Sequence, residues 1–88
     1  MKITREEIGL KVMSFIKENF IFTGQDINPE ESLLGSGTID STGILEVISF
    51  LEQTFGVQFE DKELVAENFD SVAKIQSFMF HKLAGEEH

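Results

Sequence analysis

Ser41 is the side chain in this sequence best placed for chemistry, because its hydroxyl stands at the start of a predicted amphipathic helix. A loop that contains Gly35 and Gly37 leads into Asp40 and Ser41, and the helical pattern begins directly afterwards. Backbone N–H groups and the helix dipole at such a terminus stabilise negative charge, so a phosphate ester would be well placed there. The hydroxyl is therefore either a helix cap or an attachment point.

Capping is the simpler interpretation of the pair formed by Asp40 and Ser41. Both residue types are good N-caps, and a cap stabilises a helix by about 1 kcal/mol. The sequence contains a second such pair, Asp70 and Ser71, at another predicted helix start and without a glycine-bearing approach. The glycines around the first pair distinguish it from the second, but they leave both interpretations of Ser41 open.

A serine nucleophile in an enzyme would need a base within hydrogen-bond reach and an oxyanion site. The two histidines are His81, late in a predicted helix, and His88, the last residue, and the sequence has no Gly-x-Ser-x-Gly elbow. Glu46 and Glu52 do not form an acid–base pair either, because their spacing places them about 120° apart around a helix. We therefore expect no enzymatic activity.

The composition is that of a small acidic globular protein. The 88 residues are enough for a single domain with one core, and 7 basic against 16 acidic residues give a net charge of −9. This charge disfavours nucleic acid and anionic lipid and favours basic surfaces on protein partners. No apolar run approaches the roughly 20 residues of a membrane span, so we expect no membrane insertion.

The absence of cysteine excludes disulfides and thiolate metal sites and favours the cytoplasm as the location. No acidic stretch has the spacing of a calcium-binding loop. The sequence therefore predicts no metal site.

Helical periodicity predicts an all-α bundle of three main helices and one short helix. The helices are expected at about residues 4–20, 41–55, 61–67 and 71–84, with N-caps at Thr4, at the Asp40 pair and at the Asp70 pair. Gly56 is expected to end the second helix. Its apolar face is predicted to comprise Ile44, Leu45, Val47, Ile48, Leu51 and Phe55.

A loop of about 20 residues is predicted between the first two helices, beginning with a break at residues 23–29. A loop of that length needs its own anchors in a compact domain. We expect four apolar side chains to pack inward for this purpose: Ile27, Leu33, Leu34 and Ile39.

The region around Ser41 resembles the phosphopantetheine attachment region of acyl carrier proteins and related peptidyl carrier domains. The resemblance extends from Leu33 to about Phe80. It is carried by residues 33–41 and then by Glu46, Leu51, Glu52, Phe55, Gly56, Val57, Phe59, Asp61, Leu64, Asn68, Phe69 and the segment 72–75.

The resemblance implies that Ser41 carries a 4′-phosphopantetheine arm, transferred from coenzyme A by a holo-synthase, which is a phosphopantetheinyl transferase. The arm's thiol would hold acyl, aminoacyl or peptidyl cargo as a thioester. The resemblance also implies that the acidic second helix is the docking surface, with Asp40, Glu46 and Glu52 contacting basic residues of partners. Those partners would be the holo-synthase, an acyl- or aminoacyl-activating ligase and downstream acyl-transferring enzymes, acting on a monomeric, acyl-carrier-like bundle.

Thr42 departs from the family pattern, which usually has an aliphatic residue directly after the serine, at a place that partner enzymes commonly contact. The smaller and more polar side chain predicts docking enzymes different from those of bulk fatty-acid synthesis, and hence a specialised pathway. Met1 and the short polar tail after Leu83 predict a free-standing carrier.

Two questions stay open at the level of sequence. Cargo could enter between helices at Val47, Ile48, Leu51, Phe69 and Ile75, although such positions usually form core. The alternative function is an acidic helical protein-interaction module in which Ser41 is only a cap and is never modified.

Overall fold

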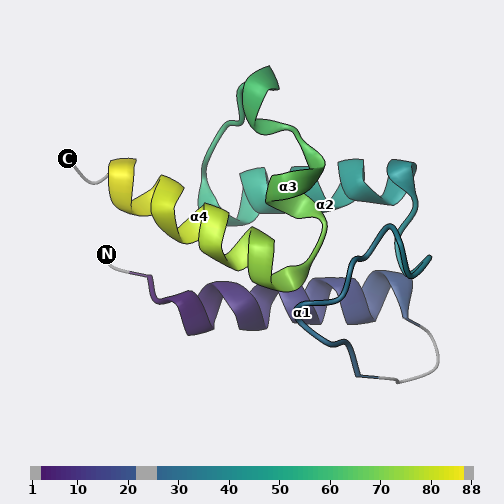
Figure 1. Ribbon diagram of the computed structural model, residues 1–88. Coiled ribbons are helices and arrows are strands. Elements are labelled where there is room, and N and C mark those ends of the chain that lie inside the picture. The colour runs from purple at the N-terminus through teal and green to yellow at the C-terminus, as the bar shows by residue number, and fades with distance from the viewer. Residues whose placement is uncertain (1–2, 22–25, 87–88) are drawn as a thin grey trace.

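The computed structural model describes residues 3–21 and 26–86, and every regular element within these ranges is helical (Figure 1). Along the chain the elements are α1 (Arg5–Phe20), α2 (Ser41–Phe55), the 3-10 turn η1 (Asp61–Glu63), α3 (Ala66–Phe69) and α4 (Val72–Glu86). The predicted all-α fold with three main helices is therefore confirmed. Part of the break predicted at residues 23–29, and His88, lie outside the described residues.

The helices α1 and α4 pack along one another, α2 lies against α1, and the short α3 packs on α4. The start of α1 and the last turns of α4 lie at one end of the molecule in Figure 1, where the Arg5 guanidinium is 4.6 Å from the Phe80 ring centre. The long loop brings the start of α2 to the opposite end. Among the described residues, none of the helices combines the length and apolar character that a membrane span requires.

The core is built from one apolar stripe of each main helix together with side chains from the loops. Thr4 begins α1 as predicted, since its hydroxyl accepts the Glu7 amide at 3.1 Å. The stripes converge on a single cluster of buried residues: Ile8, Val12, Ile16, Leu33, Ile39, Val47, Leu51, Val57, Phe69, Val72, Ile75 and Met79.

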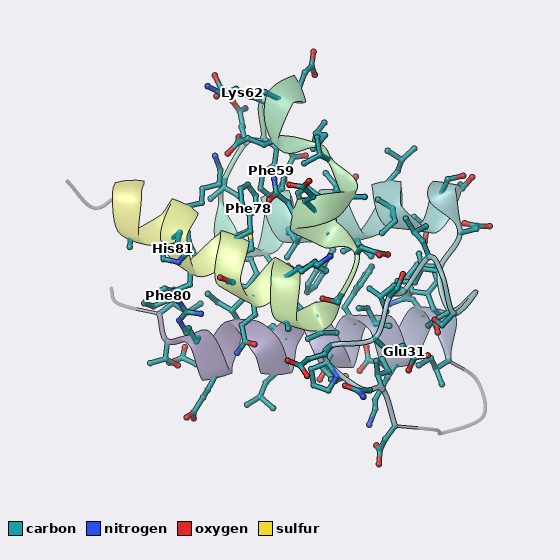
Figure 2. All side chains as sticks on the ribbon, viewed as in Figure 1. Glu31, Phe59, Lys62, Phe78, Phe80 and His81 are labelled. Carbon is teal, nitrogen blue, oxygen red and sulfur yellow. The ribbon has the colours of Figure 1, made fainter. Side chains whose placement is uncertain are left out.

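A cluster of phenylalanines extends this core toward η1. Figure 2 shows Phe59 and Phe78 against one another between the η1 segment and α4, with ring centroids 5.8 Å apart. Phe69 completes the cluster at 5.4 Å from Phe59 and 5.5 Å from Phe78. The Phe69 ring meets both other rings edge to face, an arrangement that is favourable between plain aromatic rings.

Helix α2 ends at Gly56, as predicted, because this residue adopts the left-handed conformation with φ 68° and ψ 36°. Its buried face is narrower than the sequence indicated. Leu45 was expected on that face but is 61% exposed. The residues that α2 buries fully are Gly43, Val47 and Leu51.

The short helix predicted over 61–67 is wrong as a continuous element. The chain forms η1, leaves the helical conformation at Leu64 and Val65, and only then forms α3. The side chain of Glu63 stabilises η1 by accepting the Glu60 amide at 2.8 Å. It also bonds to Lys82 of α4, with each carboxylate oxygen 3.1 Å from Nζ, so the turn is held by α4 and not by continuation of a helix.

The loop before α2 is anchored by three of its four predicted residues. Leu33 and Ile39 are each 1% exposed, and Ile27 is half-buried and packs against the core. Leu34 was expected to pack inward but is 38% exposed. Adjacent loop residues point in different directions here, because the Leu33 amide donates to the backbone of Asp70 at 2.6 Å and fixes Leu33 as the inward side chain.

Candidate functional site

The N-cap of α2 is Asp40, and this leaves Ser41 as the first helical residue. The carboxylate oxygen Oδ1 of Asp40 accepts the Gly43 amide at 2.7 Å, and the backbone of Asp40 is extended. Ser41 is exposed, and its hydroxyl makes no hydrogen bond within residues 3–21 and 26–86. The capping role is thus filled by the neighbouring carboxylate, and the hydroxyl is accessible.

The second Asp and Ser pair is arranged in the opposite way. Ser71 caps α4, since its hydroxyl accepts the Lys74 amide at 3.1 Å, and the residue is only 3% exposed. Asp70 bonds instead to the loop before α2. The same dipeptide is therefore shifted by one position between the two helices, so that Ser71 is buried and engaged whereas Ser41 is exposed and free.

Gly43 allows the start of α2 to pack closely against the preceding loop and the end of α1. A Cβ atom at this position would lie 2.6 Å from Cγ2 of Ile39 and 2.9 Å from Cε1 of Phe20. Both distances are shorter than side chains tolerate, so only glycine lets the first turn of α2 approach these residues. The position of Ser41 is set by this contact.

An apolar cavity of about 140 Å³ lies directly beside Ser41. Its walls come from α2, from the segment around α3 and from the loop. The lining residues are Leu34, Ser41, Ile44, Ile48, Leu64, Val65, Ala66, Phe69 and Asp70.

The sequence identified only part of this cavity. Ile48 and Phe69 were among the positions considered for cargo, but Val47, Leu51 and Ile75 are fully buried in the core. The sequence predicts Leu64 and Val65 within a short helix and does not indicate that they line a cavity. The signal for this wall in the sequence is the pair of adjacent apolar residues within an acidic stretch.

The loop and α3 are joined at Asp70. Its carboxylate accepts the Ser32 hydroxyl at 2.6 Å and the Leu34 amide at 3.0 Å. The hydrogen bond from Ser32, followed by that from the Leu34 amide, holds the pKa of Asp70 below its ordinary value of 3.8. Asp70 therefore stays ionised and holds the Leu34 wall of the cavity near α3.

The remaining predicted site residues differ in their exposure and in their hydrogen bonds. Thr42 and Glu46 are exposed, and neither side chain has a hydrogen bond or ion pair in the described part of the chain. Glu52 is half-buried, and its Oε2 accepts the Phe59 amide at 3.2 Å. Glu46 is free to meet a partner, whereas Glu52 already holds the segment that follows α2.

His81, the histidine within the described residues, does not lie beside Ser41. His81 lies on α4 at the end of the molecule where α1 begins, with its Nε2 3.5 Å from the Arg5 guanidinium (Figure 2). Ser41 begins α2 at the other end. Within the described ranges no group of His, Cys, Asp or Glu side chains is arranged to hold a metal ion.

The sequence is similar to several acyl carrier proteins. That of Thermotoga maritima is 31% identical over 80 residues, which is 91% of this chain and 96% of that protein. That of Acidothermus cellulolyticus is 31% identical over 64 residues, covering 73% and 76% of the two chains. That of Thermosynechococcus vestitus is 29% identical over 82 residues, covering 93% and 99%. No protein-family model matches the sequence.

Proposed function

The chain belongs to the acyl carrier protein family, and from this premise we propose that it carries acyl intermediates on a 4′-phosphopantetheine arm attached to Ser41. The observation that carries the proposal is the exposed, unengaged hydroxyl of Ser41 at the first position of α2, beside an apolar cavity. In this role the protein is a carrier and has no bond-breaking chemistry of its own.

The residues around Ser41 fit a phosphodiester. In the first turn of α2 the Gly43 amide donates to the Asp40 side chain and the Ile44 amide to the Asp40 carbonyl. Among the described residues this leaves the amides of Ser41 and Thr42 without an acceptor. These amides and the helix dipole stabilise negative charge on a group bonded to the Ser41 oxygen. Modification forms a bond from this oxygen to the pantetheine-side phosphorus of coenzyme A, the adenosine bisphosphate leaves, and the transferase takes the hydroxyl proton.

When attached, the arm supplies a thiol that holds the cargo as a thioester. The cavity beside Ser41 is lined by aliphatic and aromatic side chains, and its volume of about 140 Å³ is that of a small apolar group. Apolar protein cavities of roughly 150 Å³ take up benzene. We therefore assign the cavity to a short apolar acyl group or to the first carbons of a longer chain.

The docking surface is proposed to be the exposed side of α2 near Ser41, with Asp40, Thr42 and Glu46 as contacts. The net charge of −9 attracts basic partner surfaces. A small polar interface of this kind binds weakly and releases quickly, which suits a carrier that moves from enzyme to enzyme. Glu52 is a weaker candidate because it is half-buried, unlike the exposed Asp40, and its carboxylate holds the Phe59 amide.

The proposed partners are a phosphopantetheinyl transferase, an acyl- or aminoacyl-activating ligase and enzymes that transfer the acyl group onward. Thr42 is exposed at the place where partners would contact the residue after Ser41. Its polar side chain supports a specialised pathway rather than bulk fatty-acid synthesis.

Intact-mass spectrometry tests the proposal after incubation with coenzyme A and a transferase of broad specificity. The wild-type protein should gain the mass of one phosphopantetheine group, and Ser41→Ala should gain none. Ser49→Ala is the matched control, because it removes another exposed hydroxyl of α2 that lies outside the proposed docking contacts and should still be modified. A wild-type protein that gains no mass, or a Ser41→Ala variant that gains the full mass, contradicts the proposal and leaves the unmodified interaction module.

A further inference from the structure

We propose that Asp70 is a positioning residue that clamps two walls of the Ser41 cavity together and so keeps the cavity closed around a cargo. This inference rests on the proposed function, because it concerns the same cavity. It adds a residue that lies on neither α2 nor the loop leading to Ser41.

The first part of the clamp is the bond between Asp70 and the loop. Its two carboxylate oxygens are divided between the Ser32 hydroxyl at 2.6 Å and the Leu34 amide at 3.0 Å. The Ser32 hydroxyl in turn accepts the Gly35 amide at 2.9 Å, so the loop is folded around this contact. Leu34 is thereby fixed as a cavity wall.

The second part of the clamp is the attachment of Asp70 to α3. Asp70 directly follows α3, and its amide donates to the carbonyl of Ala66 at 2.9 Å. The cavity wall formed by Leu64, Val65 and Ala66 is continuous with this short helix. One residue therefore bonds covalently to one wall and by hydrogen bonds to the other.

The carboxylate is needed because it accepts at both oxygens. Hydrogen bonds to a charged acceptor are shorter and stronger than those to a neutral one. An asparagine at position 70 would offer one neutral accepting oxygen, and its NH₂ group could meet the Ser32 hydroxyl only as a donor, so both loop contacts would lose their charged acceptor. Leu34, already 38% exposed, would then be held less firmly over the cavity.

The first experiment uses the unmodified protein and measures amide hydrogen exchange by NMR. Asp70→Asn should raise the exchange rate of the Leu34 amide by roughly tenfold, the factor expected when a neutral acceptor replaces a charged one. Ser32→Ala, which keeps the carboxylate, should raise it less. Glu67→Gln is the matched control, since Glu67 is exposed on α3 and has no hydrogen bond or ion pair among the described residues.

The second experiment tests whether the clamp acts on cargo. Each variant is loaded from acetyl- and hexanoyl-coenzyme A, and the rate of thioester cleavage by hydroxylamine is measured for both. The ratio of the acetyl to the hexanoyl rate, divided by the same ratio for the two free acyl-coenzyme A thioesters, reports how far the cavity shields the longer chain. Circular dichroism under the same conditions checks that each variant is folded. The ratio should exceed unity in wild type and Glu67→Gln, and should fall toward unity in Asp70→Asn.

The outcomes separate this inference from the proposed function. If the wild type shields hexanoyl and both Asp70→Asn and Ser32→Ala shield it equally well, the positioning role is overturned while the carrier function stands. A wild-type ratio of unity also overturns it, because the cavity then holds no cargo. If the wild type accepts no group at all, the carrier function itself fails. Ser32→Ala keeps the test decisive if Asp70→Asn does not fold.

Discussion

Asp40 and Gly43 are joined by a hydrogen bond of 2.7 Å from the Gly43 amide to the Asp40 carboxylate, and this bond makes Asp40 the cap of α2. Asp40→Ala should therefore lower the free energy of unfolding by about 1 kcal/mol. Asp40→Asn should retain most of that stability, because an amide oxygen can still accept the bond. Ser41→Ala should change it by less than about 0.5 kcal/mol, since it removes an exposed hydroxyl without a partner. Urea unfolding followed by circular dichroism measures all three, and equal losses for Asp40→Ala and Ser41→Ala would contradict the assignment of the cap.

Gly43→Ala should destabilise the protein although glycine is the poorer helix former. The added methyl group meets Ile39 and Phe20 at 2.6 and 2.9 Å, and overpacking of this kind costs about 1–3 kcal/mol. Gly9→Ala is the matched control on α1, because the atom it approaches, at 2.9 Å, is the terminal nitrogen of the flexible Gln76 side chain. The bond of that nitrogen to the Arg5 carbonyl is exposed and can adjust. Thermal unfolding should show a clear loss for Gly43→Ala and little change for Gly9→Ala. A stable Gly43→Ala protein would show that the close approach of α2 is not required.

The stability contributed by Asp70 should depend on pH. Its folded-state pKa is held below the ordinary 3.8 by the Ser32 hydroxyl and then by the Leu34 amide. The contribution is therefore fully present above the unfolded-state pKa and is lost as the pH falls through the folded-state pKa. Urea unfolding at a series of pH values should show the largest gap between wild type and Asp70→Asn near neutrality, and a smaller gap below pH about 3.8. A gap that stays constant over this range would mean that the carboxylate is not what holds the loop.

Glu46 and Glu52 should respond differently to substitution by alanine. Glu52→Ala removes the acceptor of the Phe59 amide and should lower the free energy of unfolding by about 0.5–1.5 kcal/mol. Glu46→Ala should leave stability unchanged and lower kcat/KM of the transferase, because an exposed charge acts mainly through encounter with a basic partner. This loss should shrink as salt is added. A salt-independent effect of Glu46→Ala, or none, would remove Glu46 from the docking surface.

The main helices could be predicted from the sequence because their signals are local. The cap at Thr4, the stop at Gly56 and the apolar periodicity of α1 each depend on neighbouring residues alone. The segment around η1 could not be predicted, because its conformation depends on the bond between Glu63 and Lys82, which lie far apart in the chain.

In the candidate site, too, local features could be predicted from the sequence and contacts between distant residues could not. The pattern around Ser41 identified the hydroxyl, but both Asp40 and Ser41 were plausible caps until the bond to Gly43 distinguished them. The role of Asp70 was not visible, because its partners Ser32 and Leu34 belong to another segment. Leu45 shows that periodicity gives the direction of a helical face but not how much of it a neighbouring element covers.

The central claim is that one oxygen atom, that of Ser41, receives the phosphopantetheine group. The most direct measurement is fragment-ion mass spectrometry of the wild-type protein after treatment with coenzyme A and a transferase, followed by proteolysis. We predict that the added group is found on residue 41, with the exposed hydroxyl of Thr42 and the buried one of Ser71 unmodified. Localisation of the group to any other residue would contradict the account.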